Sequence, residues 1–197
     1  MFLPGLAGLQ ITRLHHDLAE RYRLIGVDVP RLREAFSGSP TLTRDVALHL
    51  GLSIGVLGID SFNLLGSAYG ANVALHEQER IRALILIAPT ALRLEQQEAN
   101  GRLGPGADGS FGPDIERQLA GLTIPVLVLF GVEDIVMPPE TGRIYRAKLP
   151  NCCYALVDGA GHALEEGQPE LVVSSISDFI DGPERFSVNG RRGLITP

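Results

Sequence analysis

The sequence has 197 residues, of which 45% are hydrophobic and 20% charged, a composition typical of one folded domain. Its formal net charge of -6 provides no basic stripe to neutralise phosphates, so we expect no nucleic-acid partner. No apolar run reaches the roughly 18 residues of a membrane span, and the start lacks the basic region of a signal peptide, so we expect no membrane contact and a cytoplasmic location.

Short apolar runs bounded by turn residues predict strands buried on both faces of a parallel sheet. In chain order they cover residues 23–29, 62–66, 82–88, 125–131 and 153–159, and residues 1–4 are the remains of another strand. Segments with helical spacing lie between or after these runs, at residues 11–22, 41–59, 139–149 and 169–180. This alternation predicts an α/β fold with a mostly parallel sheet of about six strands and helices on both faces.

One stretch interrupts the alternation of strands and helices, and another follows it at the end of the chain. Residues 93–121 are polar and rich in Gly and Pro, which predicts a loop. We therefore expect a single domain over residues 1–182 and a tail over 183–197. The tail carries Asn189-Gly190 between short apolar segments, which is typical of a hairpin turn, although a frayed terminus is an equal alternative.

Sites in such sheets form at the carboxyl ends of the strands, so the residues that follow each strand are the candidates for chemistry. The segment "LLGSAYGANVAL" (64–75) places Gly66 and Gly70 around a tight strand-to-helix turn, the frame in which many hydrolases present a nucleophilic serine. Ala68 stands where that serine would be. Asp134 follows the strand at 125–131, and His162 lies in a glycine-rich turn after the strand at 153–159.

Several segments, in this order along the chain, resemble motifs of the α/β-hydrolase superfamily, and in particular generic bacterial serine hydrolases. "FLPGLAG" resembles the family's oxyanion loop, "GVEDIVMPPE" its acid loop and "GAGHALEEGQPELV" its histidine loop. The order of nucleophile, acid and histidine is also that of the family. The resemblance runs from about residue 2 to residue 180. It implies hydrolysis of an ester or related carbonyl compound, a small-molecule substrate, with no cofactor.

The resemblance also implies a role for each matching residue. Asp134 would orient His162, which would act first as general base and then as general acid. The backbone N–H groups of Leu6 and Tyr69 would form the oxyanion hole. Ala68 would be a vacant nucleophile position, because a methyl group can neither attack nor donate a proton.

Other reactive side chains are assigned no chemistry. Ser67 is next to the vacant position, but neighbouring side chains on a tight turn point in different directions, so we do not expect it to substitute. Cys152 and Cys153 are the only cysteines. Vicinal cysteines rarely pair, which fits a reducing compartment, and without further ligands at suitable spacing they predict no metal site.

The chain departs from the family in more than its missing serine. By this resemblance we expect the chain to start inside the family's third strand, with the first strands missing. The segment at 23–29 would then be an uncovered edge that invites pairing, a route to a homodimer. The helix after Ala68 is short, and the cap domain is reduced to the loop at 93–121. Such a loss opens the site and removes information on the substrate.

Three explanations compete for these departures. The chain is a hydrolase whose serine was replaced, or a non-catalytic protein that binds a ligand or partner, or a truncated product derived from a hydrolase. A replaced serine alone would not explain the changes at the start, the helix and the cap. On every reading, we expect catalysis to be impaired.

Overall fold

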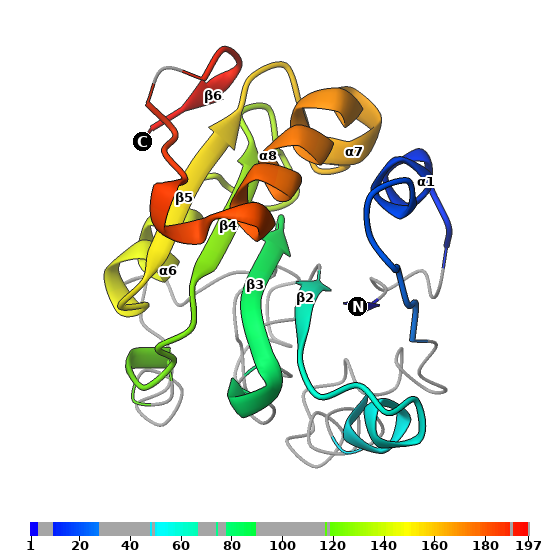
Figure 1. Ribbon diagram of the computed structural model, residues 1–197. Helices are drawn as coiled ribbons and strands as arrows, with labels where there is room; N and C mark the ends of the chain where they lie inside the picture. Colours follow the sequence, from blue (N-terminus) through cyan, green and yellow to red (C-terminus); the bar gives the residue numbers. More distant parts are fainter. Residues whose placement is uncertain are drawn as a thin grey trace, which may run out of the picture.

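The computed structural model describes residues 1–3, 10–27, 48, 50–66, 74, 78–89, 117, 119–189 and 191–196. Within these residues, six strands form one sheet in the order β1-β2-β3-β4-β5-β6 (Figure 1). Strands β1 to β5 are mutually parallel, and β6 is antiparallel to β5. The predicted α/β class with a mostly parallel sheet is confirmed.

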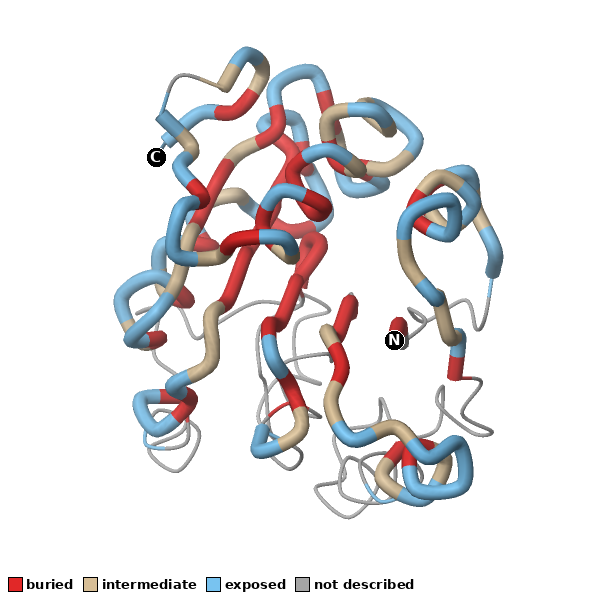
Figure 2. Tube along the Cα trace, viewed as in Figure 1, coloured by how far each residue is buried: buried red, intermediate tan, exposed pale blue. Residues whose placement is uncertain are grey.

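The strands coincide with the apolar runs of the sequence to within about two residues at most ends. Their bounds are Phe2–Leu3 (β1), Phe62–Gly66 (β2), Ile81–Ile87 (β3), Val126–Gly131 (β4), Cys152–Val157 (β5) and Leu194–Ile195 (β6). Every residue of β4 is buried, and Figure 2 shows burial concentrated along the central strands. Strands covered on both faces need apolar side chains at every position, which is why they read as continuous runs.

The described helices follow the segments with helical spacing. Their bounds are Arg13–Ala19 (α1), Thr141–Lys148 (α6), Leu164–Gly167 (α7) and Pro169–Asp181 (α8), with 3₁₀ turns at Gln78–Arg80 (η1) and Pro183–Arg185 (η2). Residues 50–56 are also helical. Helix α8 begins with Pro169, at a position where the missing N–H of proline has no intrahelical partner to lose. Among the described residues, no helix is both long and apolar enough to cross a membrane.

Helices cover both faces of the sheet, as the alternation predicts. On one face, Ile85 of β3 and Ile176 of α8 line a common cavity, and strand register continues this face across β4 to Cys153 of β5. The next residue of β5, Tyr154, points to the opposite face. Its ring lies against Gly142 of α6. Figure 1 shows α8 in front of β4 and β5, so α8 and α6 lie on opposite sides of these strands.

The predicted strand at 23–29 is reduced to a single bridge in the part that is described. Gly26 pairs with Phe2 in parallel, and the N–H of Phe2 donates to the Ile25 carbonyl at 2.9 Å. The N–H of Val27 returns a hydrogen bond to the Phe2 carbonyl at 3.2 Å. Residues 28–29 of the predicted strand lie outside the described residues.

The end of the chain adds a strand to the sheet. Leu194 and Ile195 pair with Val157 and Leu156 of β5. The Arg191 guanidinium forms an ion pair with Asp178 of α8 at 2.6 Å. Gly190 of the expected turn lies outside the described residues, as do residues 93–116 of the expected loop.

Candidate active site

Asp134 lies in the loop that follows β4, and its side chain is completely buried. Its Oδ1 atom accepts hydrogen bonds from the backbone N–H groups of Val136 at 2.9 Å and Met137 at 2.8 Å. A buried carboxylate requires such donors, because burial removes its hydration. Since the two N–H groups hold one oxygen, the orientation of the carboxyl group is set by the backbone of its own loop and Oδ2 is left for another partner.

That partner is His162, in the turn between β5 and α7. Its Nδ1 atom lies 2.8 Å from Oδ2 of Asp134. An ionised carboxylate only accepts hydrogen bonds, so we assign the ring proton to Nδ1. Nε2 then carries a lone pair, and it has no hydrogen-bond partner among the described residues. With 40% of its side chain exposed, His162 is an accessible base oriented by a buried acid.

The two loops are held together by backbone contacts. The N–H of Glu133 donates to the Ala160 carbonyl at 3.0 Å. Gly131, the last residue of β4, faces the same turn so closely that a Cβ atom there would lie 2.2 Å from the Ala160 oxygen and 2.3 Å from the Gly161 oxygen. Only glycine permits this approach. The sequence alone did not assign Gly131 a role. The one feature that could have indicated it is the presence of a glycine at the end of a strand that is otherwise fully apolar.

Proton transfer is the chemistry that this pair supports. Among the described residues, no group of three or more His, Cys, Asp or Glu side chains is placed to hold a metal ion. The cysteines are poor nucleophiles, because burial, reinforced by the neighbouring Cys153 thiol, raises the pKa of Cys152 to about 12. Burial also raises the pKa of Cys153.

The remaining predicted site residues are less fully described. Gly66 is the last residue of β2. Ala68, Tyr69 and Gly70, which follow it, and Leu6 of the expected oxyanion loop lie outside the described residues. Because β2, β4 and β5 are parallel members of one sheet, β2 ends at the same edge as the strands that carry Asp134 and His162.

Comparison of sequences finds one short but clear similarity. No protein-family model matches the chain. It is 36% identical over 73 residues to the uncharacterized hydrolase YugF of Bacillus subtilis (strain 168). The matched segment is 37% of this chain and spans only 26% of the length of that protein.

Comparison of structures finds similarity over most of the chain. Naproxen esterase (carboxylesterase NP) from Bacillus subtilis superposes with a TM-score of 0.63 at 17% identity, covering 84% of this chain and 76% of that one. A thermophilic esterase from Thermogutta terrifontis superposes with a TM-score of 0.58 at 21% identity, covering 71% and 72% of the two chains. A predicted CIB-like hydrolase from Thermoplasma acidophilum superposes with a TM-score of 0.55 at 16% identity, covering 73% and 60%. At these identities the likeness establishes a shared fold.

Proposed function

We propose that this chain, which has the α/β-hydrolase fold, holds the acid and base of an ester-hydrolysing site whose nucleophile position is Ala68. The observation that carries the proposal is the 2.8 Å contact between Asp134 and His162, with the other Asp134 oxygen held by two backbone N–H groups. An acid that orients an accessible histidine at the carboxyl edge of a parallel sheet is two thirds of a hydrolytic triad.

Each residue has a defined part in the reaction. A hydroxyl at position 68 would attack the substrate carbonyl while Nε2 of His162 accepts its proton, and the same proton would then pass to the leaving group. Asp134 would stabilise the imidazolium that forms between these steps. The N–H groups of Leu6 and Tyr69 would hold the oxyanion.

With alanine at position 68, the first of these steps has no nucleophile. Removing the nucleophile of a triad leaves only about 10³–10⁴-fold acceleration over the uncatalysed reaction, from binding and the oxyanion hole. The chain as it stands is therefore an impaired hydrolase. Two of the structurally similar proteins are esterases, which supports an ester or related carbonyl compound as the substrate class.

A second candidate function is binding without turnover, and Ala68 is the observation that favours it. A site that retains a polar histidine and loses only its nucleophile would still recognise a carbonyl or carboxyl group. In that case the rest of the site need not be arranged for attack.

Replacement of Ala68 by serine separates the two candidates. We expect Ala68→Ser to hydrolyse p-nitrophenyl acetate at least about 10²-fold faster than the parent chain, because nucleophile deletions in triads cost far more than that. Adding His162→Ala should remove the gain. Ser67→Ala in the Ala68→Ser background is the matched control, because it deletes the neighbouring hydroxyl and should keep the gain.

Two results would count against the proposal. A folded Ala68→Ser protein with no gain would favour binding without turnover. Turnover by the parent chain that depends on His162 and equals that of Ala68→Ser would show that the site needs no nucleophile at position 68.

A further inference from the structure

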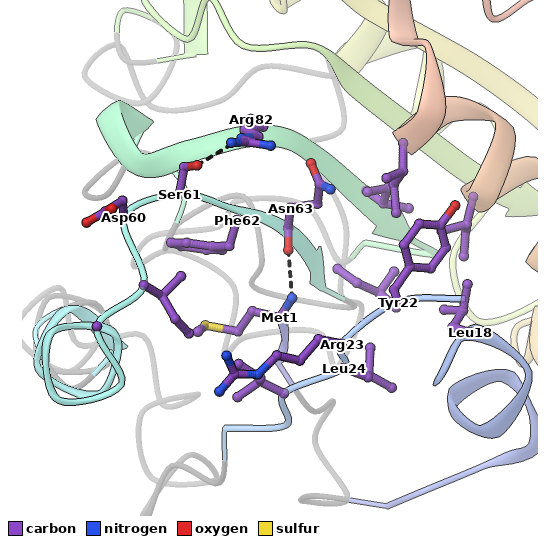
Figure 3. A pocket seen from close by; sticks show the side chains of 17 residues that line it. Met1, Leu18, Tyr22, Arg23, Leu24, Asp60, Ser61, Phe62, Asn63 and Arg82 are labelled. Carbon is purple, nitrogen blue, oxygen red and sulfur yellow. Dashed lines mark hydrogen bonds between the residues drawn. The ribbon is translucent and has the colours of Figure 1, made fainter. Parts of the chain in front are cut away.

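A cavity of about 520 Å³ lies toward the amino ends of the strands, away from Asp134 and His162 at the carboxyl ends (Figure 3). It is bordered by the amino ends of β2 and β3, by the segment that follows α1, and by α8. Asp134 and His162 follow the carboxyl ends of β4 and β5, so the cavity is a separate site. Its volume falls within the roughly 300–1,000 Å³ of pockets that hold small molecules.

Aliphatic and aromatic residues outnumber polar ones around the cavity, although polar atoms make up about half of its exposed wall. The apolar part of the wall combines side chains from α1, from both neighbouring strands and from α8, including Leu18, Phe62, Leu65, Ile85, Ile176 and Ile180. Several of these are also part of the buried core, so the wall is fixed by packing. This part of the wall favours an apolar ligand body, because transfer of apolar surface out of water is favourable.

Hydrogen-bond donors gather at one part of this lining. Arg82 Nε donates to Ser61 Oγ at 2.8 Å, which positions the guanidinium and leaves its terminal N–H groups without a partner among the described residues. The Asn63 side-chain amide lies on the same side of the cavity as Arg82 in Figure 3 and has no side-chain hydrogen bond to any described residue, whereas the Arg23 guanidinium lines the opposite side. Because the Arg82 and Asn63 donors have no partner among the described residues, they are available to bind a ligand.

The charge of this lining is positive overall. Asp60 is the one acidic side chain among the described residues that line the cavity, against two guanidinium groups. Figure 3 shows the Asp60 carboxylate directed away from Arg82 and Asn63. The donors therefore face the cavity without a neutralising carboxylate between them.

We propose that this cavity binds an amphipathic monocarboxylate. The apolar body lies against Leu65, Ile85 and Ile176, and the carboxylate binds the Arg82 guanidinium group, with the Asn63 amide as a further donor. Guanidinium N–H groups form a fork that matches the two oxygens of a carboxylate, and such charge-assisted hydrogen bonds are the strongest of their kind. A cationic amphiphile would meet like charge, and an uncharged one would leave the donors unpaired.

Calorimetric titration with three ligands of equal chain length tests this proposal on the full chain. We expect octanoate to bind saturably with one site per chain, 1-octanol to bind more weakly, and octylamine to show no saturable binding. Arg82→Gln should weaken octanoate binding by about tenfold, the effect of losing one charge-assisted hydrogen bond. Arg143→Gln is the matched control, because Arg143 lies on α6 across the sheet and its loss should leave binding unchanged.

Several outcomes would overturn the proposal. These are no saturable octanoate binding, equal binding of octanoate and octylamine, or equal weakening by Arg82→Gln and Arg143→Gln. If Arg82→Gln fails to fold by circular dichroism, Asn63→Ser carries the same expectation, and its failure to weaken binding would overturn the proposal. Hydrolysis by the Ala68→Ser protein does not enter this test, so the two proposals stand or fall separately.

Discussion

At the scale of single residues, the geometry of Asp134 is set locally. Its carboxylate receives hydrogen bonds from residues two and three positions later in the same loop, and from His162 across the turn. All three donors are independent of residue 68. A chain that lost its nucleophile would therefore keep an oriented acid and base, which is what makes restoration by a single substitution a reasonable expectation.

The close approach of Gly131 to the histidine turn gives a test of how the two loops are held. Gly131→Ala would place a methyl group against backbone atoms of Ala160 and Gly161, which cannot move aside as a flexible side chain can. We expect it to lower the free energy of unfolding by about 1–3 kcal/mol, the usual cost of overpacking. Urea denaturation followed by circular dichroism measures the difference.

Gly161→Ala is the matched control for this substitution. A Cβ atom at Gly161 would meet only the Glu133 carbonyl oxygen, at 3.8 Å, an ordinary van der Waals distance. We expect its unfolding free energy to stay within about 0.5 kcal/mol of the parent. Equal stability of the two glycine variants would show that the loops are not packed as described.

At the scale of elements, α8 ties the two ends of the chain together. Its residues Glu170 and Asp181 pair with Arg13 and Arg21 of the α1 region, at 2.7 and 3.0 Å. These pairs are exposed, and exposed pairs contribute little to stability. Burial of the apolar side of α8, which includes Phe179, contributes more, at roughly 25 cal/mol for each Å² of apolar surface removed from water.

Two serines of α8 differ in their hydrogen bonding, and this difference should change the free energy of unfolding when each is replaced. Both are completely buried, but Ser175 Oγ donates to the Leu171 carbonyl at 2.7 Å, whereas Ser177 Oγ has no hydrogen-bond partner among the described residues. A buried hydroxyl without a partner costs about 1–3 kcal/mol, and alanine is also the better helix former. We therefore expect Ser177→Ala to raise the free energy of unfolding by about 1 kcal/mol.

Ser175→Ala provides the comparison at the same depth in the same helix. It removes a hydrogen bond that is made, so it should gain less stability than Ser177→Ala or lose some. Thermal and urea unfolding of the two variants measure this difference. A Ser177→Ala protein less stable than Ser175→Ala would indicate that the Ser177 hydroxyl has a partner after all.

At the scale of the whole molecule, the parts of the fold that sequence could predict are those with a local signal. β2 to β5 are largely buried on both faces, so each appears in the sequence as an apolar run that predicts the position of the strand. Helix α8 was visible from its spacing and from Pro169. Asp134 and His162 were visible because each follows a strand in a segment that also resembles a known motif. The four-residue α7 has too few turns to show a period.

The parts that sequence could not predict depend on contacts between distant residues. Nothing local to Arg82 or Asn63 signals that they line a cavity with Ile176, about half the chain away. The close approach of Gly131 to Ala160 depends on how two loops pack. The segment at 23–27 has a strand-like sequence, but its described pairing with β1 is a single bridge between Gly26 and Phe2.

We propose that Asp134 and His162 are the acid and the base of a site that lacks its nucleophile. Covalent labelling with a fluorophosphonate, which reacts with activated serine hydroxyls, tests this proposal through the intact mass of the protein. We predict no adduct on the parent chain, one adduct at residue 68 of Ala68→Ser, and much slower labelling when His162→Ala is added. A folded Ala68→Ser protein that gains no adduct, or one whose labelling does not depend on His162, would contradict the proposal.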